Sequence, residues 1–443
     1  MKTKKRRTNY FISLTMIQIA GLLFSLSLTL ISCEGLFADD DLIADQDSLG
    51  VVDPIITKTY PIVDTGTEAF YNNSSEITES AEGQSFYGQD AHYRGNEPSY
   101  SDNGDGTITD LVSGLMWTKE IDDKITFDQA VAGAISCNVG GFTDWRLPTI
   151  KELYSLILFS GTDPSGGSSS SVPFLDDEYF DFRFGDESAG ERLIDAQYWS
   201  STEYVSTTMG GDATVFGVNF ADGRIKGYPK VFKPTGSGFT EFVRYVRGNA
   251  LYGINDFADQ EDSSIVDQST GLMWMQFDSG ELKAGNNNDG TMNWEEALEW
   301  AENLEFAGHD DWRLPDAKEL QSIVDYSRSP ATTGSPAIDP VFSCTEITNE
   351  IGQKDWAFYW SSTTHTSANG MARNAAYVSF GEASGFMEMP PNSGNYNFTD
   401  VHGAGAQRSD PKVGDPSDYP YGHGPQGDVI RIYNMVRCVR SVK

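Results

Sequence analysis

Basic residues and cysteines are both scarce in this chain of 443 residues. Lysine and arginine total 31 against 65 aspartates and glutamates, so the formal net charge is −34 at pH 7. Phosphate recognition needs a positive surface, so this balance argues against nucleic acid as a partner. The chain has four cysteines, which excludes a disulfide-rich scaffold. The apolar share of 39% is that of a globular protein rather than a disordered one.

The N-terminal segment combines a basic head with a long apolar run. Five basic residues lie within the first seven positions, and the apolar run spans residues 11–31. This pattern predicts a secretory signal, with a transmembrane helix as the alternative because the run is long enough to span a bilayer. The run ends in Leu30-Ile31-Ser32-Cys33, which resembles the lipobox of bacterial lipoproteins. The resemblance implies a signal peptide at 1–32, lipidation of Cys33 and attachment to a membrane.

An acidic segment follows Cys33. Residues 33–56 contain six aspartates and little periodicity, so we interpret them as a flexible tether. Glu34 rather than an aspartate follows the cysteine, and the sorting rule of enteric lipoproteins then implies delivery to the outer membrane. The predicted location is the outer membrane or cell surface of a bacterium.

The rest of the chain contains an internal duplication. Five motifs occur twice in the same order, at offsets between 157 and 193 residues. They are Gly-Leu-Met-Trp (114–117, 271–274), Asp-Trp-Arg-Leu-Pro (144–148, 311–315), Lys-Glu-Leu (151–153, 318–320), Tyr-Trp-Ser-Ser-Thr (198–202, 359–363) and Val-Arg-x-Val-Arg (243–247, 436–440). These offsets are too long for a solenoid, so we predict two tandem domains, at 57–250 and 251–443.

Each copy has the pattern of two helices among strands. Capping-box spacing begins at Thr126 and Thr149 in the first copy and at Asn293 and Asp316 in the second. Apolar residues follow each cap at helical spacing, and the flanking segments are β-rich. The order strand, helix, helix, several strands predicts the α+β class, with two helices and a mainly antiparallel sheet in each copy.

The motifs together resemble a known family. Asn-Gly-Asp-Gly-Thr-Ile-Thr-Asp at 103–110, with the Gly-Leu-Met-Trp, Asp-Trp-Arg-Leu-Pro and Tyr-Trp-Ser-Ser-Thr blocks, is similar to the C-terminal domain of the Legionella collagen-like (Lcl) adhesin. The resemblance covers nearly all of residues 57–443. It implies a C-type-lectin-like fold, surface exposure and, by the adhesin's example, binding of sulfated glycans. The negative charge of this chain disfavours a sulfated ligand.

The Asp-Trp-Arg-Leu-Pro motif places an arginine six residues before the glutamate of Lys-Glu-Leu. We expect a semi-buried ionic network in each copy, to which Arg244 or Arg247 could contribute. The expected members are Trp145, Arg146 and Glu152 in the first copy and Trp312, Arg313 and Glu319 in the second. An arginine site for an anion is the alternative. Similarly, we expect Trp199 and Trp360 to pack in the core, with stacking on a sugar as the alternative.

Residues 101–112 partly match a calcium-binding loop. The candidate metal ligands are Asp102, Asn103, Asp105 and Asp110, and calcium is the candidate ion. The pattern lacks the glutamate that ends a tight calcium loop. Asn-Gly and Asp-Gly are also strong signals for a hairpin turn, which is the alternative.

The second copy carries two insertions relative to the first. It gains 10 residues near 285–290 and 32 residues between its last two motifs, where we predict an inserted loop at 388–430. Long ordered loops usually have a function, so we place the candidate ligand-binding residues here: His402, Arg408, Tyr419, Tyr421 and His423. A metal site of both histidines with Asp400 or Asp410 is one alternative, and a surface loop without a ligand is the other.

Three cysteines remain besides Cys33. An odd number in an exported protein allows one disulfide and leaves one free thiol. Cys344 and Cys438 both belong to the second copy and are the expected pair, while a Cys137–Cys438 bridge stays open. Resemblance to the family implies a disulfide between a cysteine of a helix and one of the last strand. The first copy retains only the helix cysteine, Cys137, and the second copy only the strand cysteine, Cys438. In the first copy, Tyr245 occupies the position equivalent to Cys438.

The expected function is that of a lipid-anchored binding protein or adhesin, with a glycan or a surface protein as its partner. A structural envelope protein and a metal-dependent enzyme are the alternatives. The formylglycine-generating oxidases resemble this fold, but they depend on a metal-binding cysteine pair, and no two cysteines lie close in this sequence. The sequence has no pattern of a catalytic triad or carboxylate pair, so no catalytic residue is assigned.

Overall fold

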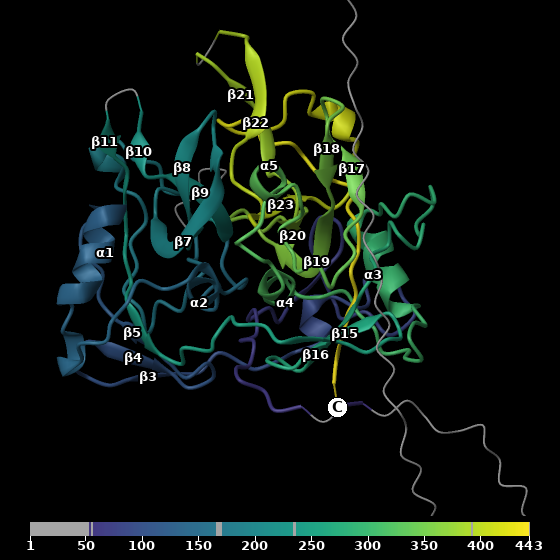
Figure 1. Ribbon diagram of the computed structural model, residues 1–443, viewed down its shortest axis with the longest axis horizontal. Coiled ribbons are helices and arrows are strands. Elements are labelled where there is room, and N and C mark those ends of the chain that lie inside the picture. The colour runs from purple at the N-terminus through teal and green to yellow at the C-terminus, as the bar shows by residue number, and fades with distance from the viewer. Residues whose placement is uncertain (1–52, 55, 165–170, 234–235, 391–392, 443) are drawn as a thin grey trace, which may run out of the picture. The chain divides into compact units, whose positions relative to one another are not determined.

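Figure 1 shows the computed structural model, which describes residues 53–54, 56–164, 171–233, 236–390 and 393–442. Cys33, the signal peptide at 1–32 and nearly all of the tether at 33–56 lie outside these residues and stay predictions. Among the described residues, no helix has the length and hydrophobicity that a membrane span requires.

Four helices begin where the capping boxes predict. They and one further helix are α1 (Phe127–Ser136), α2 (Ile150–Tyr154), α3 (Trp294–Glu302), α4 (Ala317–Ser322) and α5 (Pro330–Thr333). The side chains of Thr126, Thr149, Asn293 and Asp316 accept from the third helical amide, and the glutamine or glutamate there returns a bond to the cap backbone. Two unpaired groups at each helix end are thereby satisfied together, which explains why these short helices form.

A four-stranded antiparallel sheet recurs in each copy, in the order β13-β5-β4-β3 and β24-β16-β15-β14. The strands are β3 (Tyr100–Asp102), β4 (Thr107–Asp110), β5 (Leu115–Thr118), β13 (Val246–Gly248), β14 (Phe257–Asp259), β15 (Ser264–Asp267), β16 (Leu272–Met275) and β24 (Val439–Ser441). Trp117 and Trp274 take the same place in the two sheets and are fully buried. The last strand of each copy pairs with the hairpin that begins it, which brings the ends of each copy together.

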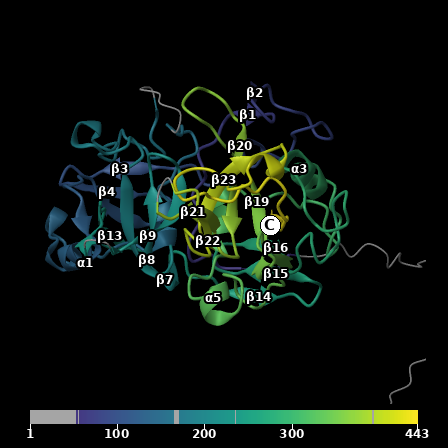
Figure 2. The ribbon, with the colours of Figure 1, turned by 90° about the horizontal axis from the view of Figure 1, so that it is seen from above.

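The two copies share one antiparallel sheet of six strands, ordered β19-β20-β23-β9-β8-β7. The strands are β7 (Gln197–Thr208), β8 (Asp212–Asn219), β9 (Arg224–Pro229), β19 (Phe358–His365), β20 (Asn374–Ser379) and β23 (Gln407–Pro411). β23 pairs with β20 and also, through Gln407 and Ile225, with β9 of the first copy. Figure 2 shows β7, β8 and β9 beside β23, β20 and β19. The described residues are thus α+β or mainly β, built from antiparallel sheets.

The segment 388–430 is not the irregular loop predicted from the sequence. It contains β22 (Tyr396–Asp400), β23 and the 3-10 helix η4 (Pro416–Asp418). In the first copy Val218 of β8 pairs with Ile225 of β9, whereas at the equivalent place Val378 of β20 pairs with Gln407 of β23. β21 (Ser384–Glu388), which follows β20 as β9 follows β8, instead forms a hairpin with β22. The inserted residues therefore replace a strand of the duplicated domain.

The segment before β3 packs against the second copy. The Tyr93 hydroxyl donates to Glu302 at 2.8 Å, and the Asn73 amide donates to Glu295 at 3.0 Å. The short elements of this and other connections are β1 (Phe70–Tyr71), β2 (Glu76–Ile77), β6 (Ile125–Thr126), β10 (Val231–Phe232), β11 (Ser237–Gly238), β12 (Thr240–Glu241), β17 (Glu346–Thr348), β18 (Lys354–Trp356), η1 (Asp90–His92), η2 (Val139–Gly141) and η3 (Glu187–Ala189). The domain boundaries proposed from the sequence stay predictions.

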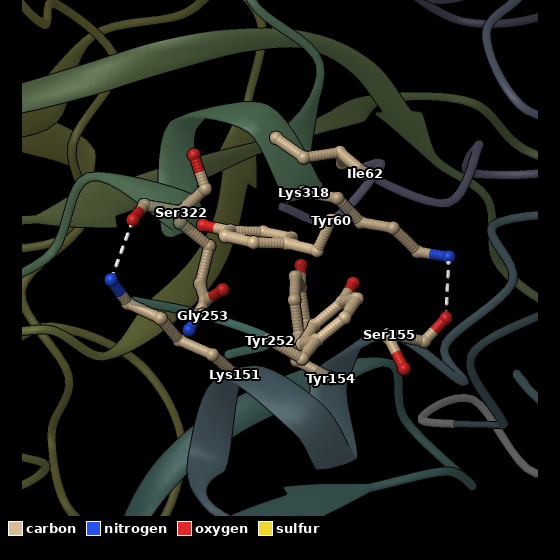
Figure 3. A pocket seen from close by; sticks show the side chains of 10 residues that line it. Tyr60, Ile62, Lys151, Tyr154, Ser155, Tyr252, Gly253, Lys318 and Ser322 are labelled. Atoms are coloured by element: carbon tan, nitrogen blue, oxygen red, sulfur yellow. Dashed lines mark hydrogen bonds between the residues drawn. The ribbon is translucent and has the colours of Figure 1, made fainter. Parts of the chain in front are cut away.

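Equivalent lysines join α2 and α4 across the two copies (Figure 3). Lys151 Nζ donates to the carbonyl of Ser322 at 2.6 Å, and Lys318 Nζ donates to the carbonyl of Ser155 at 2.9 Å. The lysines and the serines are each 167 residues apart, so one contact is made twice, as in a two-fold symmetric dimer. Burial lowers the pKa of both lysines to about 8. The duplicated domains thus pack as an internal pseudo-dimer.

Candidate functional site

The Arg–Glu pairs expected from the sequence are present in both copies. Arg146 donates two bonds of 2.5 Å to Glu152, and Arg313 donates two bonds of 2.6 Å to Glu319. The indoles of Trp145 and Trp312 each donate to a backbone carbonyl six residues earlier. Each guanidinium already holds a carboxylate, so these arginines have a structural role and the anion-site alternative finds no support.

Arg244 and Arg247 do not join these networks. Arg244 is fully buried and donates to the backbone carbonyls of Thr118, Lys119 and Asp181. Arg247 pairs with Asp144 at 2.7 Å. Sequence spacing did not reveal these partners, because they come from other segments of the chain.

Trp199 and Trp360 belong to the core and cannot stack on a sugar. Both are fully buried, and their indoles donate to the carbonyls of Ile125 at 2.9 Å and Met292 at 3.0 Å. The core interpretation of the Tyr-Trp-Ser-Ser-Thr motif is the one that the structure supports.

The candidate calcium loop forms a hairpin turn. Asp102 pairs with Lys119 at 2.6 Å and Asp105 accepts from the Thr107 hydroxyl at 2.6 Å. Asn103 donates to Thr107, and Asp110 accepts from the amides of the next turn. Within the described residues, no three His, Cys, Asp or Glu side chains are arranged to hold a metal ion. The turn and a lysine already use the polar groups of this loop, which favours the hairpin-turn alternative; the calcium site stays a prediction.

The predicted Cys344–Cys438 disulfide is absent, and so is the alternative with Cys137, because all three are free thiols. The Tyr359 hydroxyl donates to Cys344 Sγ at 3.2 Å. Cys438 is instead buried in a separate apolar cluster that includes Trp312. The two thiols thus belong to different parts of the second copy, and burial raises the pKa of Cys344 to about 12.

The predicted ligand-binding residues of the insertion fall into two groups. His402 and Arg408 are buried, whereas Tyr421 and His423 are exposed and Tyr419 is half-buried. The alternative metal site is not formed, since Asp400 accepts from the Tyr204 hydroxyl and Asp410 from the Arg431 amide.

The buried group is organised by Asp428. His402 Nε2 lies 2.9 Å from one oxygen of this carboxylate, and Arg408 donates to the other oxygen. Burial, reinforced by the charge of Arg408, lowers the pKa of His402 to about 4, so its ring is neutral at pH 7. Although burial opposes ionisation of Asp428, Arg408 and His402 hold its pKa well below the usual range. The group is therefore an ion pair with a neutral histidine attached.

Of the exposed group, Tyr421 forms an aromatic surface with Tyr396 of the β21–β22 hairpin, which is labelled at the top of Figure 1. The rings of Tyr396 and Tyr421 stack at 4.1 Å between centroids, with 11° between their planes. These residues, which we name the tyrosine platform, are 41% and 52% exposed. Phe386 packs edge-on against Tyr421 at 6.1 Å and supports the pair from below. Sequence reasoning missed Tyr396, although its position between Asn395 and Asn397 in a Gly- and Ser-containing turn was an available signal.

These observations define a class of protein: a duplicated, mainly antiparallel domain pair with an aromatic surface on an insertion in its second copy. The chain belongs to the Lcl C-terminal domain family, whose profile matches residues 106–247 and 263–401. The second match ends before His402, so β23 and the segment that carries Tyr421 lie beyond it. Comparisons with curated proteins and with solved structures gave no match.

Proposed function

We propose that this protein is a lipid-anchored binding protein of the bacterial cell envelope, with two C-type-lectin-like domains, and that its ligand is a neutral glycan. The observation that carries the proposal is the tyrosine platform. The two stacked rings leave apolar surface exposed to solvent, and aromatic rings with a polar hydroxyl suit the apolar faces and hydroxyl groups of sugars.

The surroundings of the platform favour a neutral ligand. Asn395 and Asn397 are exposed next to Tyr396 and offer amide donors and acceptors. The net charge of −34 would repel sulfated or acidic polysaccharides. The exposed groups near the platform are therefore aromatic rings and amides rather than lysine and arginine, which favours a neutral sugar over an anionic one.

The test is a glycan array probed with the full-length protein in detergent. Wild type is compared with Tyr396→Ala, Tyr421→Ala and the control Tyr433→Ala, an exposed tyrosine outside the platform. Each platform variant should lose affinity by about tenfold or more, as aromatic hot spots do, while the control keeps it. Binding should be unchanged by EDTA, since Lys119 and the hairpin turn already use the polar groups of the candidate calcium loop. A blank array for wild type would overturn the proposal and favour a protein partner or a structural role.

A further inference from the structure

A small pocket lies at the base of the β21–β22 hairpin. Phe358 and Tyr377 contribute apolar surface, and Ser384, His402, Arg408, Asp428 and Arg431 contribute polar surface. Arg431 is already paired with Glu350. The pocket is partly open and has room for about one water molecule. Its polar half comes from the hairpin and from the residues that follow it, most of them beyond the part that the family profile matches.

Three buried polar atoms around this pocket lack a partner among the described residues. They are Ser384 Oγ, His402 Nδ1 and Arg408 Nη1. All three side chains belong to residues more than nine-tenths buried. Buried polar groups are normally hydrogen-bonded, so three unpaired groups around one pocket indicate a site that a ligand completes.

The protonation states follow from the contacts. Asp428 is ionised and can only accept, so His402 Nε2 carries the proton that points to it. Because the ring is neutral, Nδ1 has a free lone pair and can only accept. Arg408 Nη1 can only donate. A group that fits between them must accept from the arginine and donate to the histidine.

A hydroxyl group meets both requirements, as do water and a primary amide, whereas a carboxylate and an ammonium group each fail one of them. A carboxylate could accept from Arg408 but could not donate to His402, and it would lie against the negative Asp428. An ammonium group could donate to His402 but would be repelled by Arg408. Ser384 can act in either sense and accommodates the hydroxyl's remaining bond.

We propose that this pocket receives the primary hydroxyl of a hexose, that is, the CH₂OH arm of one sugar of the bound glycan. The space admits a hydroxyl on a short arm but not a sugar ring. Ser384 and Glu388 lie at opposite ends of β21, and Glu388 pairs with Tyr396, so the pocket and the platform are roughly 13 Å apart along the strand. That the ligand is a glycan rests on the proposed function. The need for a hydroxyl group follows separately from the polar atoms around the pocket.

The test compares hexosides with their 6-deoxy counterparts. Methyl glucoside and methyl galactoside are titrated against methyl 6-deoxyglucoside and methyl 6-deoxygalactoside, with full-length protein carrying ¹⁵N-labelled histidine. Five histidines make the ring spectrum assignable. At least one hexoside should shift the Nδ1 resonance of His402 and bind at least about tenfold more tightly than its 6-deoxy partner. Ser384→Ala should reduce this preference, whereas the control Ser361→Ala, another buried serine of the second copy, should not.

The outcomes separate the pocket from the platform. Equal binding of hexoside and 6-deoxy partner, lost in the platform variants, would overturn the pocket and leave the proposed function intact. Glycerol provides a separate probe of the pocket should no glycoside bind. If glycerol shifts the Nδ1 resonance of His402 in wild type but not in Ser384→Ala, the pocket binds a hydroxyl group, and the glycan as its ligand is overturned. No shift with any probe would overturn the proposal and leave only a structural water there.

Discussion

The contribution of the buried Arg–Glu pairs to stability can be tested by removing the equivalent arginine from each copy. Arg146 and Arg313 make equivalent bidentate contacts to Glu152 and Glu319, but their surroundings differ. The Arg313 and Glu319 side chains are 10% and 8% exposed, while those of Arg146 and Glu152 are 36% and 2% exposed. The ring of Tyr93 also covers Arg313, at 5.3 Å from its guanidinium carbon.

The two substitutions should therefore lower the free energy of unfolding by unequal amounts. In Arg313→Ala, the carboxyl group of Glu319 loses its partner in a closed site, so the free energy of unfolding should fall by about 3–5 kcal/mol, the usual cost of stranding one member of a buried pair. Asp90 and Asp316 lie near Glu319 and add repulsion. In Arg146→Ala, water can reach Glu152 through the space that the arginine leaves, and we expect a loss of about 1–2 kcal/mol.

Urea denaturation followed by tryptophan fluorescence measures both losses. The double variant Arg313→Ala/Glu319→Gln should recover part of the stability, because glutamine is neutral and still accepts from the cap backbone. Equal losses for the two single variants, or no recovery in the double variant, would refute the assignment of the cost to the stranded carboxylate.

Three further predictions follow from the junction and the buried groups. Lys151→Met and Lys318→Met should each lower stability by about 1–3 kcal/mol in urea, since each leaves a backbone carbonyl of the other copy unpaired; a loss for only one of them would contradict the reciprocal contact. Burial, with Asp64 nearby, raises the pKa of Asp90 to about 7, so its stabilising contribution is complete below its ordinary pKa of 3.8 and is lost as the pH rises through about 7. Asp90→Asn should therefore flatten the fall in Tm between about pH 4 and 7, and an unchanged profile would show that another group causes it. Alkylation of the urea-unfolded chain without reductant, read by mass spectrometry, should modify Cys137, Cys344 and Cys438, and a protected pair would restore a disulfide.

Local chemistry made part of this structure predictable. The capping boxes at Thr126 and Asn293 specify helix starts because all their hydrogen bonds lie within four residues. The motif pairs revealed the duplication, and the Arg146–Glu152 pair followed from spacing across one turn. These features depend on residues that lie close together in the chain or on motifs that recur in it, and both can be seen in a single sequence.

Long-range pairing could not be predicted in the same way. Nothing local to Gln407 shows that it pairs with both Val378 and Ile225. For a related reason, the sequence did not show that Asp102 of the candidate calcium loop pairs with Lys119, which follows β5. For the candidate site, Tyr421 was found but Ser384 was not, because a lone serine becomes informative only when the pocket around it is known.

The insertion links the two copies and the candidate site through the same residues. β23 carries Arg408 into the pocket and also joins the sheet of the first copy. The first copy in turn holds the insertion, since the Gly227 amide of β9 donates to the His402 carbonyl at 2.9 Å. A Cβ at position 227 would lie 2.7 Å from that carbonyl oxygen, so the approach requires glycine. The first copy thus holds His402 in place at the pocket without contributing a side chain to its lining. One of the two duplicated domains can in this way support an insertion in the other.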